Sequence, residues 1–132
     1  MRKGPAVMEE IRRRLHHLMS RAYAPYSHYP VAAMVKGESG RTFEGVNVEN
    51  ASYALARCAE QGAVSRMVAE GDRRILEVWV MTPDGGTPCG GCRQILAEFA
   101  GPETLVHCLS AAGQATTYTM GELLPHAFRL EP

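Results

Sequence analysis

The stretch Pro88-Cys89-Gly90-Gly91-Cys92 carries the strongest local signal in the chain, and it leads into a predicted helix over residues 92–99. Two cysteines three positions apart place both sulfurs on one side of the first helical turn. The N-terminus of a helix offers unpaired N–H groups and a partial positive charge, and both stabilise thiolates. By itself, a Cys-x-x-Cys pair is compatible with a zinc site, a redox pair or a chance occurrence.

A second motif, Cys58-Ala59-Glu60, begins another predicted helix over residues 58–69. It adds a third thiolate and a carboxylate to the first pair. Three protein ligands leave one position of a tetrahedral zinc site open, which is typical of catalytic rather than structural sites. A carboxylate that lies beside the metal without binding it can move protons to and from an activated water. We therefore predict a zinc site with Glu60 as its acid–base group.

A structural zinc site requires a fourth protein ligand, and His107 and Cys108 are candidates for it. Both fall inside a predicted strand over residues 105–109 and lack the paired spacing of metal ligands. Cys108 is therefore interpreted as a small buried apolar side chain.

Hydrophobic patterning predicts a single domain over residues 1–132 in which helices alternate with strands. An amphipathic helix lies within the first 23 residues, and a short helical tail is expected over residues 122–128. This order favours a three-layer α/β/α sandwich on a mixed sheet of about five strands. The expected strands are residues 31–35, 42–48, 75–81, 105–109 and 115–118.

The composition argues against several classes of partner. The 132 residues include 14 Lys and Arg and 14 Asp and Glu, so the formal net charge is zero. A neutral chain is not drawn to nucleic acid or to an anionic membrane, and it contains no apolar run of about 18 residues that predicts a transmembrane helix. Charged residues interrupt the N-terminal segment, which argues against a secretory signal. We expect a cytoplasmic protein with no nucleic-acid or membrane partner, whose cysteines are metal ligands or free thiols.

Together, the two cysteine motifs match the pattern of zinc deaminases, in its three-cysteine form. Over nearly its full length the chain resembles the small, homotetrameric type of cytidine deaminase. The resemblance implies hydrolytic deamination of cytidine and deoxycytidine to uridine and deoxyuridine with release of ammonia, which is a step of pyrimidine salvage. It also implies one Zn²⁺ per subunit and a homotetramer whose sites are completed by neighbouring subunits. Besides the cysteine motifs, the segments that carry it are Ala22-Tyr23-Ala24-Pro25-Tyr26-Ser27, Gly45-Val46-Asn47-Val48-Glu49-Asn50-Ala51-Ser52-Tyr53, Arg93-Gln94, Leu123-Leu124-Pro125 and Phe128.

The resemblance further implies the chemistry at the metal. Cys58, Cys89 and Cys92 hold the zinc. Glu60 takes a proton from the attacking water, protonates the pyrimidine ring at N3 and assists the departure of ammonia. The oxygen of that water adds to C4 of the ring.

Several further residues are implied to contact the nucleoside. Asn47 and Glu49 match a pair that binds the 3′-hydroxyl of the sugar, which suits an amide and a carboxylate because together they offer a donor and acceptors. Ordinary loop chemistry is the competing interpretation of this pair. The other implied contacts are Tyr29 against the base or sugar, Tyr53 near the subunit contact, Phe128 reaching a neighbour's pyrimidine, and the backbone near Ala59 at the amide edge of the base. Core packing for Tyr29 and a helix-end anchor for Phe128 are the alternatives.

One departure from the family pattern concerns charge. The family commonly has an arginine directly after the catalytic glutamate, and this chain has Gln61. Zinc bound to three thiolates carries a net negative charge, which weakens its action as a Lewis acid. Compensation must then come from the helix N-termini, from Arg57 or from Arg93.

Three other functions remain as alternatives. A deaminase of a modified or antibiotic cytosine nucleoside, of the blasticidin type, would use the same zinc mechanism. A nucleic-acid editing deaminase would need a basic groove and aromatic stacking platforms, which this neutral chain does not suggest. A non-enzymatic zinc module would need a fourth ligand and would not depend on Glu60.

Overall fold

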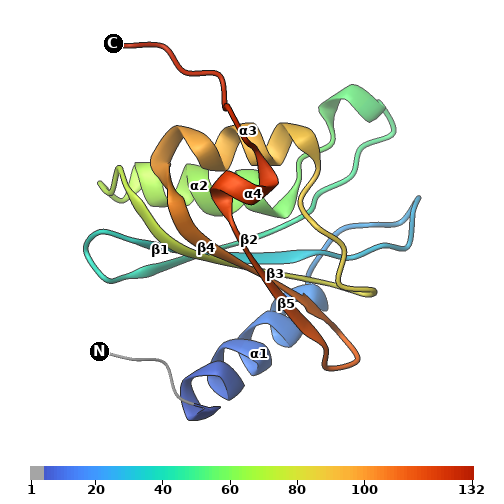
Figure 1. The fold of residues 1–132 in the computed structure, drawn as a ribbon. Helices are drawn as coiled ribbons and strands as arrows, with labels where there is room; N and C mark the ends of the chain where they lie inside the picture. The colour runs from blue at the N-terminus through green and yellow to red at the C-terminus, as the bar shows by residue number, and fades with distance from the viewer. Residues whose placement is uncertain (1–4) are drawn as a thin grey trace.

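The computed structural model describes residues 5–132 and arranges them in three layers (Figure 1). A five-stranded mixed sheet forms the middle layer; α1 (Pro5–Met19) covers one face, and α2 (Ala59–Ala69) and α3 (Gly90–Phe99) cover the other. The expected α/β/α sandwich is therefore confirmed. The strands, in chain order, are β1 (Ala32–Gly37), β2 (Thr42–Val46), β3 (Ile75–Thr82), β4 (Ala100–Ser110) and β5 (Ala115–Thr119).

The strands lie in the order β2-β1-β3-β4-β5. β3 and β4 are parallel, because α3 crosses between them and returns the chain to the same end of the sheet. The other neighbouring strands pair in antiparallel fashion. Helices α2 and α3 are in contact and run in the same direction, so that both begin at the right of the view in Figure 1. The topology thus brings two helix N-termini together on one face of the sheet.

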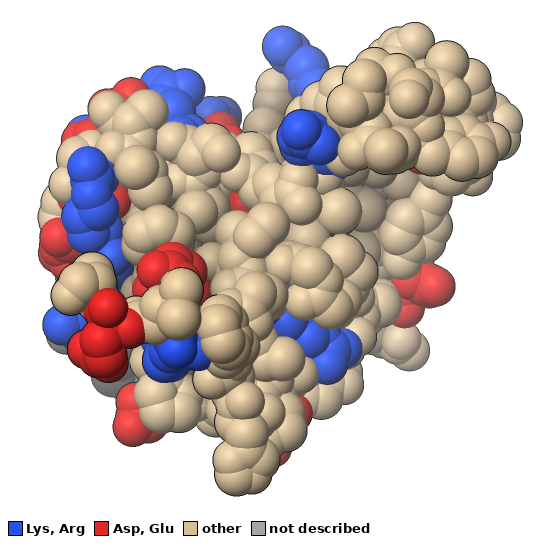
Figure 2. Space-filling view, turned by 90° about the horizontal axis from the view of Figure 1, so that it is seen from above, with Lys and Arg blue, Asp and Glu red and all other residues tan. Residues whose placement is uncertain are grey.

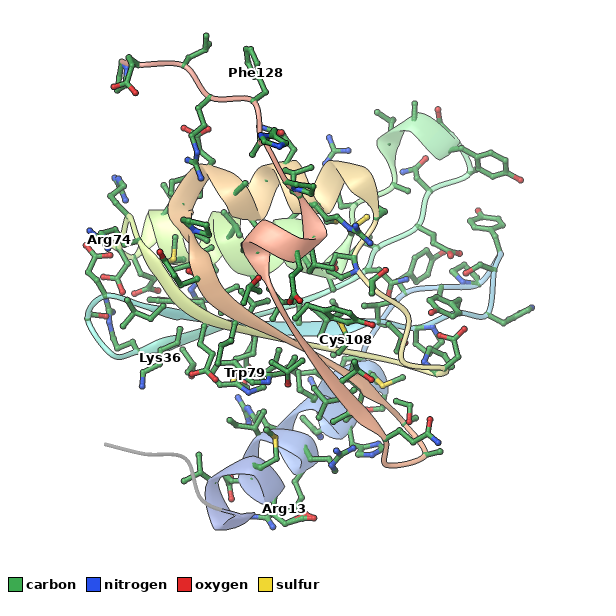
Figure 3. The ribbon with its side chains drawn as sticks, viewed as in Figure 1. Arg13, Lys36, Arg74, Trp79, Cys108 and Phe128 are labelled. Atoms are coloured by element: carbon green, nitrogen blue, oxygen red, sulfur yellow. The ribbon has the colours of Figure 1, made fainter. Side chains whose placement is uncertain are left out.

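Apolar side chains on both faces of the sheet join the layers. On one face, Leu15 of α1 is buried in a cluster with Trp79 and Met81 of β3. Figure 3 shows Trp79 on the side of the sheet that faces α1. The larger cluster lies beneath α2 and α3 and includes Ala63, Val64, Met67, Leu96, Val78, Val80, Val106 and Cys108. The helices that carry the cysteine motifs therefore rest on a fully packed core.

A close approach between β2 and α2 fixes where α2 begins. A Cβ atom at Gly45 would lie 2.3 Å from the carbonyl oxygen of Ala59 and 2.5 Å from the backbone nitrogen of Ala63, so a side chain there would displace the helix. Gly62 lies opposite, where an added Cβ would be 3.5 Å from the Gly45 Cα. The absence of side chains at both positions lets the first turn of α2, which follows Cys58, sit directly against the sheet.

The structure corrects the predicted tail helix over residues 122–128. The helix α4 is shorter and earlier, Met120–Leu123, because Thr119 and Glu122 form a capping box that starts it. Pro125 lacks an N–H and disfavours a helical conformation at the residue before it, so the helix ends at Leu123. Residues 124–132 follow without regular structure, and Phe128 is therefore not on a helix.

Smaller differences concern the starts of other elements. Cys58 is the N-cap of α2 instead of its first residue, and α3 begins at Gly90, two residues before the predicted start, with Cys89 as its N-cap. β4 begins at Ala100, earlier than the predicted residue 105, because Ala100 already pairs with Ile75 before a register shift. Within residues 5–132, no helix combines the length and apolar character needed to cross a bilayer.

Candidate metal and catalytic site

Three cysteine sulfurs meet where α2 and α3 begin. Cys58 and Cys89 are the N-cap residues of the two helices, both with extended backbones, and Cys92 lies in the first turn of α3. Their Sγ atoms all lie within 4.8 Å of one another. Cys92 is buried, Cys58 half-buried and Cys89 exposed, so the cluster opens toward solvent on the Cys89 side. The structure therefore brings together all three predicted metal ligands.

The geometry and chemistry of this cluster fit a zinc ion. Tetrahedral zinc with Zn–S bonds of about 2.3 Å holds its sulfurs about 3.8 Å apart, which the observed cluster accommodates. Metal-bound cysteines must lose their protons. A hydrogen bond from the Cys92 thiol lowers the pKa of Cys58 to about 6, whereas that same bond and burial raise the pKa of Cys92. Two helix N-termini pointing at the cluster favour the thiolate form.

Glu60 lies in the first turn of α2 and points to the same place. Its side chain is buried, with 4% of the residue exposed, and its Oε1 lies 3.5 Å from the Cys92 Sγ. Burial raises the pKa of this carboxyl group. A carboxyl group in such an environment holds a proton more readily than one in water, which suits a group that accepts a proton and later donates it.

The two candidates for a fourth ligand do not join the cluster. Cys108 is 2% exposed in β4, and burial raises its pKa to about 11, so it is a buried apolar thiol as predicted. Figure 3 places Cys108 within the sheet. His107 is engaged elsewhere: its ring stacks on Trp79 with centroids 5.6 Å apart, and its Nδ1 lies 2.8 Å from the Thr117 hydroxyl. Among the described residues, three cysteines form the metal cluster without a fourth protein ligand.

The segment after β2 joins the cysteine cluster to the loop before β1. Val48 exchanges backbone hydrogen bonds of 2.9 Å with Arg57, the residue before Cys58. On either side of Val48, the Asn47 carbonyl accepts from the Tyr23 N–H and the Glu49 N–H donates to the Tyr23 carbonyl, at 3.0 and 2.9 Å. Residues 47–49 therefore lie between the loop at residue 23 and the approach to the metal site.

Asn47 and Glu49 use their side chains to hold the loop of residues 26–31. The Asn47 amide donates to the Tyr29 carbonyl and accepts from the Val31 N–H, both at 2.9 Å. Glu49 accepts from the backbone N–H of Tyr26 and from the backbone and hydroxyl of Ser27. The Ser27 hydroxyl is the main reason that the pKa of Glu49 is lowered. Carboxylate and amide oxygens have further lone pairs, so both residues can still accept from a ligand.

A hollow of about 330 Å³ lies beside Glu49. Its lining combines Glu49 with the aromatic rings of Tyr26 and Tyr53. Aromatic walls with a few polar groups are typical of small-molecule sites. The other lining residues are Ser27, Asn50 and Ala56.

The predicted aromatic contacts have different environments. The Tyr29 hydroxyl donates to Asp84 at 2.6 Å, which ties its loop to the loop before Cys89. Tyr53, in the short helix η1 (Tyr53–Leu55), is 82% exposed. Phe128 is 67% exposed on the C-terminal segment above α3, where Figure 3 shows its ring directed away from the body of the molecule. The single chain does not bring Tyr53 or Phe128 into a closed site.

Ala59 is fully buried at the start of α2, so only its backbone is available to a ligand. The sequence does not predict the partners that Ser27 and Asp84 take. Asp84 is 55 residues from Tyr29 in the chain, and no local pattern indicates that the two side chains meet.

The side chains of the two residues around the second motif, Arg57 and Gln61, hydrogen-bond to backbone groups. The Gln61 side chain accepts from the Cys58 backbone N–H at 3.4 Å, and this contact caps α2 without adding charge. Arg57 is exposed and donates to the carbonyl of Ala56 at 3.1 Å. Arg93 lies half-buried in the first turn of α3, and with the two helix N-termini it remains a candidate from the sequence.

Fold and site together define an α/β protein with a three-cysteine metal centre and an adjacent buried acid. The profile of the cytidine and deoxycytidylate deaminase zinc-binding region matches residues 6–108. The chain therefore belongs to the cytidine and deoxycytidylate deaminase family, and its cysteine cluster is compatible with one zinc ion per subunit.

Individual relatives agree with this assignment. The chain is 38% identical over 112 residues to a cytidine deaminase of Sporosarcina psychrophila, with 83% of this chain and 82% of that protein aligned. The crystal structure of cytidine deaminase from Burkholderia pseudomallei superposes with a TM-score of 0.85 at 35% identity, covering 91% of this chain and 98% of the other. The cytidine deaminase structure from Mycobacterium leprae gives a TM-score of 0.77 at 38% identity, covering 90% and 98%.

Proposed function

We propose that this protein is a zinc-dependent cytidine deaminase that converts cytidine and deoxycytidine, with water, to uridine and deoxyuridine plus ammonia. The observation that carries the proposal is the buried Glu60 carboxylate, 3.5 Å from the Cys92 sulfur in a three-cysteine cluster at two helix N-termini. This arrangement provides a site for a metal and, beside it, a proton carrier that is not needed as a ligand.

In the proposed reaction, the metal would activate the water and Glu60 transfers the protons. Zinc held by Cys58, Cys89 and Cys92 would act as the Lewis acid that makes water a nucleophile at neutral pH. Glu60 takes the proton from the attacking water as its oxygen adds to C4, and passes that proton to N3 of the ring. When the C4–N4 bond breaks, Glu60 transfers the second proton of the water to the departing amino group, which leaves as ammonia. Its buried position excludes bulk water from both transfers.

Asn47 and Glu49 bind the 3′-hydroxyl of the sugar in this proposal. Both lie on the segment bonded to the approach to Cys58, and Glu49 borders the hollow beside Tyr26 and Tyr53. Tyr29 packs against the nucleoside from the facing loop, and the Ala59 backbone reads the amide edge of the base.

A homotetramer would complete the site. Tyr53 and Phe128 are large, exposed aromatic side chains, which are unfavourable in water and suit a contact between subunits. Figure 2 looks down on the face with α2, α3 and α4; its charged groups gather mainly on the left, and the lobe projecting on the right carries few of them. We assign the tetramer contacts to Tyr53 and Phe128.

We also propose that residues 1–132 form one domain. We expect the enzyme to work in the cytoplasm on free nucleosides and to bind neither nucleic acid nor membranes.

The test follows the ultraviolet absorbance of cytidine with protein of measured zinc content. We expect the cytidine band to be lost with wild-type protein, and Glu60→Gln to lower kcat by about 10³-fold while zinc content is unchanged. Unchanged cytidine with fully zinc-loaded wild-type protein would refute the proposal. Activity on a modified or antibiotic cytosine nucleoside under those conditions would establish the blasticidin-type alternative instead.

A further inference from the structure

Arg93 directly follows the last cysteine of the metal cluster and folds back over the start of its own helix. All three nitrogens of its guanidinium group donate hydrogen bonds. Nε reaches the carbonyl of Pro88 at 2.8 Å, and Nη2 reaches the hydroxyl of Thr87 at 2.8 Å. Nη1 reaches the carbonyl of Leu123, at the end of α4, at 2.7 Å. One side chain therefore holds the two residues before Cys89 and also the start of the C-terminal segment.

The charge of Arg93 is poorly placed for helix stability alone. A cation in the first turn of a helix opposes the positive end of the helix dipole. Within residues 5–132, no carboxylate forms an ion pair with Arg93. Its position is instead favourable beside a cluster of thiolates, whose negative charge exceeds that of one zinc ion.

Gln94, the residue after Arg93, also binds the C-terminal segment. Gln94 donates from Nε2 to the carbonyl of Phe128 at 3.1 Å. Two consecutive residues after Cys92 thus bind backbone carbonyls at Leu123 and Phe128. Because residues 124–132 have no helix or strand of their own, these two contacts, together with that of Arg129 to the Ala100 carbonyl, hold the segment against the body of the protein.

We propose that Arg93 is a positioning residue that sets the place of Cys89 in the metal site and joins that site to the C-terminal segment bearing Phe128. The inference rests on the proposed function, because it takes the three cysteines as zinc ligands. A planar guanidinium with donors in fixed directions can serve all three acceptors at once, and a lysine ammonium cannot. Groups that orient metal ligands through hydrogen bonds commonly contribute about 10-fold to 100-fold to metal affinity.

The experiment compares zinc affinity in four variants by competition with a chromogenic chelator, without substrate. We expect Arg93→Gln and Arg93→Lys each to raise the Kd for zinc by about 10-fold or more. Thr87→Val removes one of the three acceptors of Arg93 and should raise the Kd for zinc by about 3-fold. The matched control is Arg129→Gln, since Arg129 donates to the Ala100 carbonyl at 3.2 Å from the same segment without touching residues 87 and 88. Its Kd should equal that of the wild type.

A coupling test and kinetics separate positioning from general destabilisation. In the Arg93→Gln background, Thr87→Val should have no further effect on zinc affinity, because its partner is already gone. With zinc saturating, Arg93→Gln should also raise KM for cytidine, whereas Arg129→Gln should not. Zinc affinity equal to wild type in Arg93→Gln, or in Thr87→Val if the arginine variants do not fold, would overturn the inference. A wild-type protein that binds zinc but leaves cytidine unchanged would refute the proposed function alone.

Discussion

The cysteine cluster and the loops that we propose to bind the nucleoside are joined through residues 47–49 but are supported differently. Cys58, Cys89 and Cys92 are carried by the first turns of two helices that rest on a packed core. Asn47 and Glu49 lie just beyond β2, where their side chains hold another loop in place. The cysteine cluster is thus held by packed helices, whereas the Asn47 and Glu49 region is held by a network of largely exposed hydrogen bonds. Changes on the two sides should have different consequences.

The largest effect should come from removing a metal ligand. Cys92→Ala is expected to abolish zinc binding and activity, because two sulfurs cannot hold the ion in competition with water. Cys108→Ala is the matched control, since Cys108 is equally buried but outside the cluster. It should keep full zinc content and cost about 1 kcal/mol of stability. Metal content and deamination rate measured on both proteins check this, and zinc loss in Cys108→Ala would contradict it.

Asn47→Ala should weaken both the loop and substrate binding while leaving zinc in place. It removes the partners of the Tyr29 carbonyl and the Val31 N–H, so we expect a loss of about 1–3 kcal/mol in the free energy of unfolding. KM for cytidine should rise as well. Urea unfolding and steady-state kinetics at saturating zinc provide the measurement.

Thr104→Val is the control for this change, because the Thr104 hydroxyl also accepts from a backbone N–H, that of Gly101 at 3.1 Å, and does not line the hollow beside Glu49. An unchanged KM in Asn47→Ala would show that Asn47 has a role in the loop but none in binding the sugar.

Phe128→Ala should affect substrate binding without affecting the stability of the single chain. The ring is 67% exposed, so its removal creates no cavity. If it stacks on a pyrimidine in a neighbouring subunit, its loss should raise KM by about 5-fold, which corresponds to about 1 kcal/mol. Leu130→Ala, on the same segment and 77% exposed, should leave KM unchanged. A KM for Phe128→Ala equal to that of Leu130→Ala would show that Phe128 does not contribute to substrate binding.

The smallest effect is the pH dependence of the Glu49 contacts. Hydrogen bonds from Ser27 and Tyr26 lower the pKa of Glu49 in the folded protein, so its contribution to stability is present above the unfolded pKa of about 4.3. This contribution is lost as the pH falls through the lower folded value. The advantage of wild type over Glu49→Gln in the free energy of unfolding should be constant near neutral pH and shrink on acidification. A difference that does not depend on pH would contradict this origin.

The metal site could be predicted because its spacing is local. A cysteine at each helix start, with Cys92 and Glu60 within the next turn, already determines which side of each helix carries the chemistry. The α/β/α architecture was predictable for the same reason, since hydrophobic periodicity is local. The tail helix was placed wrongly because a capping box at Thr119 and the proline at 125 outweighed the apolar pattern.

The sequence by itself determined the three thiols, the acid beside them and the alternation of helices and strands, because each depends on residues within one or two turns. Only the tertiary structure decided that the thiols meet, since this requires the parallel pairing of β3 with β4 and the contact of Gly45 with α2. It also decided which partners the polar side chains take: Tyr29 with Asp84, Glu49 with Ser27, and Arg93 with Thr87, Pro88 and Leu123. Most of these pairs are distant in the chain, and hydrogen bonds of this kind depend on the packed positions of whole elements.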